Sequence, residues 1–593
     1  MKNKSILVDY LNLYTIIYIV FFKYKKVNLL YKHKYLNNLY SFLCQKLSIK
    51  LQYLTIQYSS SNYESYKEIV KEKDFLIDQE FVGKDLLSNY LYKRYFYERI
   101  HPVVEIKVFF GHQRFDKVLI NYGNYFNLLD KKDTFYNKVK YYSLPLLSFH
   151  EKATWKRVIY INKMKNFIRS YVISIIKIMR FSLSFSKFPG STVLVASQFK
   201  DSFVNDSLYS LGKSGIEYML IDPVSFNLYS SNGVKIKHLY SVHFLNFFKT
   251  IKGIFKINRA FANKQGMSLS LYLHILEKAK DVFFLSQIIK ESDVKITFTC
   301  YEGSQLTNIL NILGYERDDI VSLGAMWSLG AYPEFIGDLY KSCDIFFTWG
   351  KRQNSSYLAC RSPFKSLVTV GYPGDYAMNF MEKKPEDNIQ KLRDKGIKIV
   401  AVYDNAVASD SFSTYSQLNN FYKGVLCLLQ EGSFACVIKS KKHLELSTYL
   451  DKKLLENLLI HKDNIIFNNE RANLSPAFKS DYVYAFQLSS LGNVASIWGN
   501  KTIFYDEGRF INENEISKNS IIIMNYKDLL PNLKALEKNS FFIDKDSHID
   551  PFVDGDAQNR ITEYIRLLLS FKDKSKSSMI KESNIVYKKK YGK

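Results

Sequence analysis

The sequence predicts an α/β protein with two parallel, doubly wound sheets that follow one another along the chain. From residue 189 onward, short apolar runs of strand length alternate with segments of helical periodicity. That alternation is typical of parallel sheets. The segment VTVGYPGDYAM at 368–378 interrupts the series and looks like a crossover, because a second series of the same kind begins after it. With 593 residues, the chain is long enough for two or three domains.

Residues 1–188 are expected to form an N-terminal α/β extension, with short strand-like runs such as 103–110 and 118–121. An apolar stretch at 14–22 is too short to span a bilayer. A strand and helix of a folded domain is therefore the better interpretation. The extension ends at 163–188 in a basic, apolar helix-like run. This run fits either a membrane interface or a helix packed on the next domain.

Pro189-Gly190 marks the start of the first sheet domain, 189–370, and the second sheet domain follows at 371–571. The remaining residues, 572–593, are polar and charged, which predicts a mobile basic tail. Expected strands are 192–197, 217–222, 294–300, 320–323 and 345–348 in the first domain, and 398–403, 435–439, 465–467, 482–486 and 502–505 in the second.

The formal net charge of +26 points to a polyanionic partner, either nucleic acid or an anionic membrane surface. Codon bias towards lysine is the alternative explanation. The sequence has no helix-turn-helix, zinc-finger or single-strand-binding signature, so we predict no nucleic-acid partner. It also has no cluster of residues with metal-ligand spacing, which predicts a metal-independent protein.

The most informative segment is DYVYAFQLSSLGNVASIWGNKTIFYD at 481–506. An apolar strand ends in the pair Ser489-Ser490, and Gly492 and Asn493 follow in a short helix before the next strand. A strand, tight turn, helix and strand in this order place backbone N–H groups and hydroxyls on a phosphate at the helix N-terminus. An ordinary helix N-cap is the alternative interpretation of the serine pair.

Other candidates for binding a phosphorylated ligand lie at neighbouring strand ends. Lys439 and Lys441 follow the strand at 435–439 and could add positive charge. Asp404 ends the strand before it, and Glu507 comes just after the strand at 502–505. For the lysines a solvated surface position is the alternative, and for the two carboxylates a turn or loop position.

Several motifs occur in an order that resembles one enzyme family. They are DIFFTWGKRQNSSYL…LVTVGYPGD at 344–375, then IKIVAVYDNA, FACVIKSKKH and LSSLGNVASIWGNKTIFYD. This order resembles the GT-B glycosyltransferases of bacterial capsule and O-antigen synthesis, over about 190–570. The resemblance implies two Rossmann-like domains facing a cleft, with the donor nucleotide in the C-terminal one. Many relatives have His-Pro where this chain has Ser-Lys-Lys-His, so a CMP-, UDP- or GDP-sugar donor stays undetermined.

In such an enzyme the catalytic base comes from the first sheet domain, and Glu302 is the candidate. It follows the strand at 294–300 in TCYEGSQLTN, where Gly303 permits close approach. A carboxylate there could remove the proton of the acceptor hydroxyl. The alternative is a glutamate that merely favours the start of the next helix.

The resemblance further implies a nucleotide-sugar substrate, a lipid-linked glycan acceptor and no cofactor. The expected location is cytoplasmic, on the inner face of the cytoplasmic membrane, where anionic lipids attract a basic protein. Two alternatives stay open: a sugar-nucleotide 2-epimerase of similar fold, and a non-enzymatic polyanion-binding protein.

Overall fold

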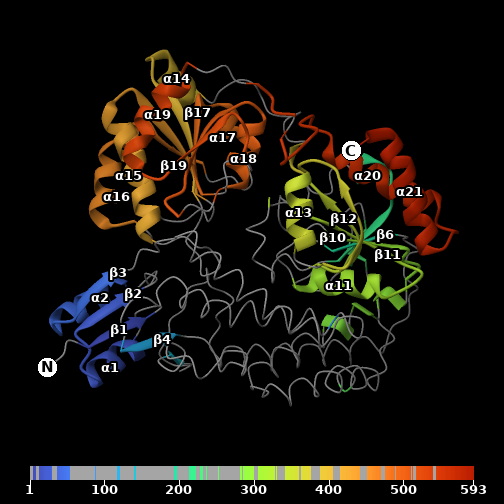
Figure 1. Cartoon of the computed structure of the whole chain (residues 1–593), viewed down its shortest axis with the longest axis horizontal. Coiled ribbons are helices and arrows are strands. Elements are labelled where there is room, and N and C mark those ends of the chain that lie inside the picture. The colour runs from blue at the N-terminus through green and yellow to red at the C-terminus, as the bar shows by residue number, and fades with distance from the viewer. Residues whose placement is uncertain are drawn as a thin grey trace.

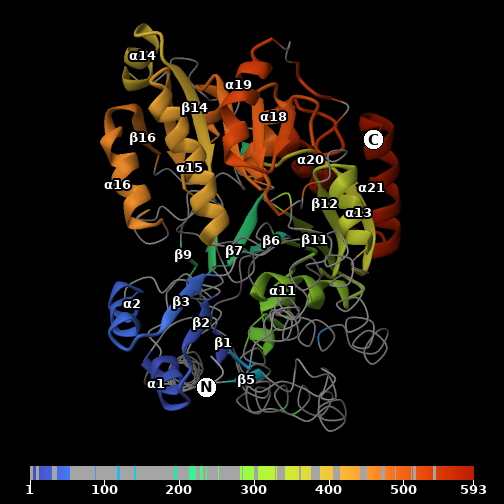
Figure 2. The same cartoon turned by 60° about the vertical axis from the view of Figure 1, so that its left-hand side comes forward.

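The computed structural model describes three separate sheets (Figures 1 and 2). Its described residues are 4–8, 13–29, 37–53, 87, 116–120 and 139–141, short segments between 193 and 290, and most of 292–592. Within the last range, the main loops left out are 300–304, 330–340, 376–386, 405–414 and 441–445. The expected strand at 103–110 and the basic run at 163–188 lie outside the described residues.

The N-terminal extension is α/β, as predicted, and contains a parallel sheet of its own. Its strand order is β3-β2-β1-β4-β5. The residues buried between this sheet and its helices include Ile6, Val8, Ile16, Ile19 and Val27. The elements are β1 (Ser5–Val8), α1 (Leu13–Phe21), β2 (Lys26–Leu29), α2 (Asn37–Lys46), β3 (Lys50–Tyr53), β4 (Lys117–Ile120) and β5 (Val139–Tyr141).

The second sheet has the order β13-β12-β11-β10-β6-β7-β8-β9, and its strands are parallel from β13 to β7. Only β8 and β9, at one edge, pair antiparallel. The elements are β6 (Val193–Ala196), β7 (Tyr218–Ile221), β8 (Leu228–Ser230), β9 (Lys235–Ile236), β10 (Ile296–Thr299), α11 (Gln305–Tyr315), β11 (Val321–Ala325), β12 (Cys343–Thr348), α13 (Lys351–Ala359) and β13 (Phe364–Thr369).

The third sheet is wholly parallel, with the order β16-β15-β14-β17-β18-β19. Two Rossmann-like sheets therefore follow the N-terminal one, as predicted. The elements are α14 (Asp387–Asp394), β14 (Lys398–Tyr403), α15 (Tyr415–Glu431), β15 (Phe434–Lys439), α16 (Lys452–Ile460), β16 (Ile465–Phe467), α17 (Ser475–Phe478), β17 (Tyr482–Phe486), α18 (Ser490–Ile497), β18 (Lys501–Tyr505), β19 (Ser520–Ile523) and α19 (Leu529–Leu536).

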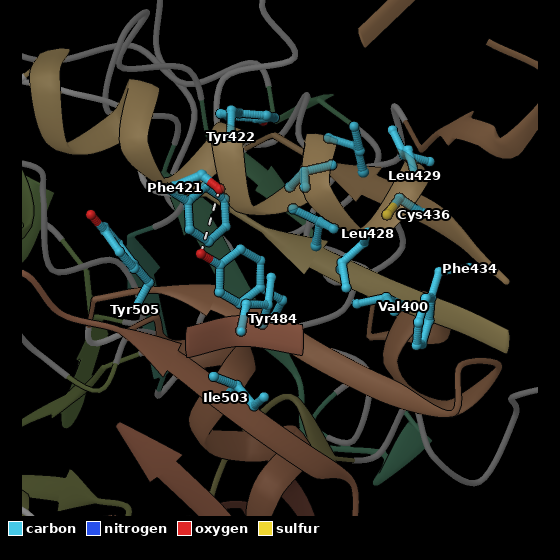
Figure 3. Close-up of a cluster of buried hydrophobic side chains, with 14 of the residues drawn as sticks. Val400, Phe421, Tyr422, Leu428, Leu429, Phe434, Cys436, Tyr484, Ile503 and Tyr505 are labelled. Atoms are coloured by element: carbon cyan, nitrogen blue, oxygen red, sulfur yellow. Dashed lines mark hydrogen bonds between the residues drawn. The ribbon is translucent and has the colours of Figure 1, made fainter. Parts of the chain in front are cut away.

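Alternation along these strands fixes which helices cover each face of the third sheet. Val400 and Val402 pack with α15, α16 and α19, whereas Ala401 and Tyr403 pack with α17 and α18. Successive side chains point to opposite faces of a strand, so a run buried on both faces reads as continuously apolar. Figure 3 shows the first of these cores, where the Tyr484 hydroxyl donates to the Phe421 carbonyl at 3.4 Å.

The chain end differs from the prediction of a mobile tail. Residues from 557 onward form α20 (Ala557–Ser570) and α21 (Lys576–Tyr591), which pack on the second sheet (Figure 1). The Lys576 ammonium is 4% exposed, contacts Asp344 at 2.8 Å and donates to the carbonyls of Gly314, Tyr315 and Arg317. The prediction was wrong because these partners lie about 230–260 residues away in the sequence. Helix α20, which we placed in the 371–571 domain, likewise belongs to the core of the second sheet.

The crossover at 370–375 is held by a cluster of buried charges. Arg560 is 1% exposed and donates to the Val370 carbonyl at 2.7 Å and to both Asp554 oxygens at 2.8 Å. The Asp550 carboxylate accepts from the Tyr372 amide at 2.8 Å, and Asp375 accepts from the Ala557 amide at 3.3 Å. The crossover between the two Rossmann-like sheets is thus fixed by residues of the loop before α20 and of α20 itself.

Asp375 should make this chain less stable as the pH rises from acid to neutral. Burial, followed by the neighbouring Asp550 carboxylate, raises the pKa of Asp375 well above its usual range. An acid whose pKa is raised by folding adds stability below its unfolded pKa of about 3.9 and loses that stability as the pH rises through the folded value. Asp375→Asn should therefore unfold at higher urea concentration than the parent at pH 7, and the difference should shrink towards pH 4.

Asp319→Asn is the control for this pH dependence. Hydrogen bonding to Arg317 lowers the pKa of Asp319, so its contribution is present above the unfolded pKa and lost in acid. The control should be no more stable than the parent at pH 7. An Asp375→Asn protein that is less stable than the parent at pH 7 would contradict the assignment.

Candidate functional site

The strand order of the third sheet locates its candidate ligand site. Counted from β14 along the chain, that order is 3-2-1-4-5-6, so the direction of winding reverses between β14 and β17. In open parallel sheets ligands bind outside the carboxyl ends of the strands that flank this reversal. The candidate site therefore lies beyond Tyr403 and Phe486, where β14 and β17 end.

The strand register brings several of the sequence candidates to that edge. Tyr403 pairs with Lys439 on one side and with Ala485 on the other. Asp404 directly follows Tyr403, and Gln487 comes two residues after Ala485. Asp404 and Lys439, which lie 35 positions apart in sequence, thus share one sheet edge with the turn that precedes α18.

The side chains of Ser489 and Asn493 hold that turn in place. Ser489 is the N-cap of α18, and its hydroxyl accepts from the Gly492 amide at 3.4 Å. Asn493 is fully buried and donates to the Ser489 carbonyl at 2.9 Å. The amides of Ser490 and Leu491 are at the start of the helix, where no preceding turn supplies an acceptor. An anion at the positive end of the helix could accept hydrogen bonds from these amides.

Ser490 also joins the two Rossmann-like sheets. Its hydroxyl oxygen accepts a hydrogen bond from the Leu329 amide at 3.0 Å, and Leu329 follows β11 of the second sheet. Close by, Leu329, Trp349 and Tyr372 pack in one cluster with Val494 and Ile497 of α18. Helix α18 accordingly lies on the side of the third sheet that faces the second (Figure 1). A ligand at its N-terminus would lie beside both domains.

Gln487 was missed by the sequence analysis. It has a positive φ of 48° and is 6% exposed, and its Nε2 has no hydrogen-bond partner among the described residues. Positive φ is uncommon for residues other than glycine, and such strain clusters at functional sites. No signal in the sequence distinguishes this glutamine from any other at a strand end. Its unpaired donor lies in the residue that links β17 to the Ser489 turn.

Asp404 and Glu507 are held from the face of the sheet that α15 covers. Asp404 is 6% exposed and accepts from the Tyr422 hydroxyl at 2.7 Å. Burial, and then the Asp404 charge, raise the pKa of Tyr422 well above its usual range, so this hydroxyl keeps its proton. Glu507 accepts from the Tyr505 hydroxyl at 2.7 Å and from the Asn420 amide at 3.2 Å. Both carboxylates are therefore fixed in place at the carboxyl edge.

The remaining candidates are placed only in part. Lys439 is 5% exposed, and its ammonium lies 3.5 Å from the Asn468 side-chain oxygen. Lys441 and Glu302 lie outside the described residues. Glu302 comes three positions after the end of β10 and three before the start of α11. In sequence it thus lies between the carboxyl end of β10 and the start of α11, and the winding of the second sheet reverses between β6 and β10.

Gly492 is required for packing. A Cβ at this position would lie 2.7 Å from the Ala485 Cβ and 3.0 Å from the Phe504 ring. Gly→Ala in a helix ordinarily stabilises by up to about 1 kcal/mol. Here, overpacking should reverse the sign and cost about 1–3 kcal/mol. Urea unfolding of Gly492→Ala measures this, and a variant more stable than the parent would contradict the close approach.

Two properties of the described residues concern metal binding and membrane spanning. No group of three or more His, Cys, Asp or Glu side chains within them could hold a metal ion. None of the helices in the described part of the chain is long and apolar enough to cross a membrane.

No family model matches this chain, and no curated protein matches it. Among solved structures it is similar to S. aureus MnaA with UDP, at TM-score 0.40 and 15% identity over 64% of this chain and 97% of that one. A UDP-N-acetylglucosamine 2-epimerase gives TM-score 0.39 and 11% identity over 65% and 98%. The wall teichoic acid polymerase TagF gives 0.35 and 11% over 68% and 96%.

Proposed function

We propose that this chain is a glycosyltransferase of GT-B fold that moves a sugar from a nucleotide-sugar donor to a growing, lipid-linked surface polysaccharide. The observation that carries the proposal is the switch point between β14 and β17. There the start of α18, with the amides of Ser490 and Leu491, lies next to the domain that contributes Glu302. The donor nucleotide is a CMP-, UDP- or GDP-sugar, and no cofactor or metal ion takes part.

The residues at the switch point divide the work of holding the donor. The α18 N-terminus and the Ser490 hydroxyl receive the donor phosphate, because they present N–H and O–H donors to an anion. Lys439, with Lys441, supplies positive charge as the phosphate leaves. Asp404 and Glu507 accept hydrogen bonds from hydroxyl groups of the donor ribose or sugar. The buried Gln487 amide can donate a further hydrogen bond to the same ligand.

The transfer step needs one base. The Glu302 carboxylate takes the proton from the acceptor hydroxyl while that oxygen forms a bond to the anomeric carbon. The bond from the anomeric carbon to the phosphate oxygen breaks at the same time, and the nucleotide leaves with the electron pair. Charge on the leaving phosphate is stabilised by donors already in place, so no reorganisation is needed at that moment.

Because the proposed acceptor is lipid-linked, the enzyme would work at a membrane surface. In the proposal the chain is cytoplasmic and peripheral, on the anionic inner face of the cytoplasmic membrane. Its net charge of +26 supports this, since a basic protein is drawn to an anionic leaflet.

The proposal is tested by incubating the purified chain with each radiolabelled CMP-, UDP- and GDP-sugar and a lipid extract that contains glycan acceptors. The expected result is nucleotide release together with label in the lipid-extractable glycan. If the donor instead changes to its 2-epimer with the nucleotide attached, the chain is an epimerase. If the chain binds none of the donors and converts none of them, the enzyme proposal fails.

A further inference from the structure

Helix α1 has an outer face that a surface helix of a soluble domain would not carry. Its sequence LYTIIYIVF has no charged residue. Ile16 and Ile19 are buried in the N-terminal core, yet Ile17, Val20 and Phe21 on the other side are 52%, 44% and 76% exposed. A helix on a protein surface normally has an apolar stripe that faces the core and a polar face towards solvent. Apolar side chains gathered in the open mark an interaction site.

Other exposed apolar side chains lie on the segments next to this face. Phe22, directly after α1, is 40% exposed, and its ring lies 5.1 Å from that of Phe21. Phe42 on α2 and Leu47 just after it are 52% and 42% exposed. The segments that follow the two helices run side by side, because the Lys50 amide at the start of β3 donates to the Lys25 carbonyl just before β2 at 2.9 Å. We call Ile17, Val20, Phe21, Phe22, Phe42 and Leu47 the α1–α2 surface.

Lysines line the same end of the sheet. Lys26 and Lys50 are the first residues of β2 and β3, and the register places Ser5, Lys26 and Lys50 side by side. Lys117 begins β4 and pairs with Ile6. Lys23 and Lys25 lie between α1 and β2, and the Lys46 ammonium lies 5.6 Å from the Phe42 ring centre.

Carboxylates do not balance these lysines within the described residues of the N-terminal extension. The exception there is Asp116, whose carboxylate accepts from the Ser5 amide at 2.7 Å. The α1–α2 surface therefore combines exposed aromatic and aliphatic side chains with a rim of positive charge. In both views α1 lies at the side of the N-terminal sheet that is remote from α15 and α16 (Figures 1 and 2).

We propose that the α1–α2 surface docks this protein on an anionic lipid bilayer. Apolar side chains enter the boundary between headgroups and acyl chains, and the lysines meet the lipid phosphates and carboxylates. Helix α1, nine residues or about 14 Å long, lies in the interface and does not span it. This proposal specifies which surface meets the membrane in the proposed function. It rests on that membrane partner and does not depend on the transfer chemistry.

Charge and chemistry favour a bilayer over other occupants. A second copy of the chain would bring two lysine rims together, and like charges would oppose that dimer. Nucleic acid could neutralise the lysines, but its backbone offers nothing to Ile17, Val20 and Leu47. A bilayer offers anionic headgroups and hydrocarbon together.

The test is sedimentation of the full chain with vesicles of phosphatidylcholine containing about 30% phosphatidylserine, without nucleotide or acceptor. The parent should bind these vesicles and bind pure phosphatidylcholine vesicles far more weakly. Ile17→Ser with Phe21→Ser should weaken partitioning at least about tenfold, because two largely exposed apolar side chains lose their burial. Lys23→Gln with Lys25→Gln should weaken it about fivefold per lysine, and added salt should do the same.

Ile460→Ser is the matched control, because Ile460 is 75% exposed at the end of α16, in the third sheet domain. It should bind vesicles like the parent. Circular dichroism and the thermal midpoint verify that each variant is folded. Equal binding by the parent and the Ile17/Phe21 variant would overturn the proposal. So would a parent that prefers duplex DNA to vesicles, or one that dimerises through these residues.

The same variants separate this inference from the proposed function. Hydrolysis of the nucleotide sugar in solution should be unchanged in the Ile17/Phe21 variant, because its substitutions lie in the N-terminal sheet. Vesicle binding without any donor turnover would support the docking surface and contradict the transferase proposal. Donor turnover without vesicle binding would support the transferase and contradict the docking surface.

Discussion

Replacing Glu302 by glutamine is expected to lower sugar transfer by about 10²–10⁴-fold, the usual contribution of a general base. The amide keeps the size and hydrogen bonding of the side chain but cannot take a proton. Nucleotide affinity should stay within a factor of about two, since the donor is held by the third sheet. Single-turnover transfer and equilibrium nucleotide titration measure the two quantities separately.

Glu316→Gln provides the comparison for that substitution. Glu316 follows α11, so it lies at the opposite end of the helix that begins after Glu302. The same chemical change there should leave transfer unaltered. Undiminished turnover by the Glu302→Gln enzyme would remove Glu302 from the mechanism while leaving the nucleotide site in place.

Arg560→Met should destabilise the chain by about 3 kcal/mol, because the buried Asp375 and Asp550 carboxyl groups would lose the guanidinium beside them. Methionine retains most of the buried volume but donates no hydrogen bond. The Val370 carbonyl would lose its donor, and Asp375 would lose the Arg560 charge, which lowers its pKa. Urea unfolding at pH 7 should show a lower midpoint, and the crossover at 370–375 should become more sensitive to protease.

Arg317→Met is the control, since Arg317 makes a similar two-pronged contact with Asp319 at 2.7 Å and 2.9 Å. That pair is 40% and 51% exposed, so its loss should cost at most about 1 kcal/mol. If the two variants lose equal stability, burial of Arg560 is not what holds the crossover.

The strands of the third sheet could be predicted closely from the sequence. The expected strands at 398–403 and 482–486 match β14 and β17 residue for residue. Both are buried on two faces, so they appear as unbroken apolar runs bounded by polar residues. Edge strands β13 and β19 were not foreseen, because they carry partly exposed residues and give a weaker signal.

The strand-to-helix turn at 487–493 could be predicted from the sequence, but its side-chain contacts could not. The Ser489–Asn493 turn lies at the switch point, yet strand order, which defines that point, depends on pairings the sequence does not state. Of the two interpretations of the serine pair, the helix N-cap holds for Ser489, and phosphate binding at this turn stays a prediction. Ser489 caps the helix, whereas Ser490 reaches Leu329 of the other domain. No sequence pattern around Gln487 predicts its positive φ.

The end of the chain could not be predicted because its partners are remote. Met579, Ile580 and Tyr587 form a narrow buried stripe on a helix whose other residues are mostly polar. The sequence does not show that Lys576 contacts Asp344 and donates to three carbonyls, so the pattern predicts solvent-exposed lysines for this segment.

The most direct test of the account is hydrogen exchange of the chain with and without a bound nucleotide. CMP, UDP and GDP would each be titrated, and the one that binds used at saturation. The amides of the turn at 487–493 should exchange more slowly in the complex, together with those around Asp404, and Ser490→Ala should weaken the affinity. Binding that protects other segments and leaves 487–493 unchanged would contradict the assignment of the donor site to the β14–β17 switch point.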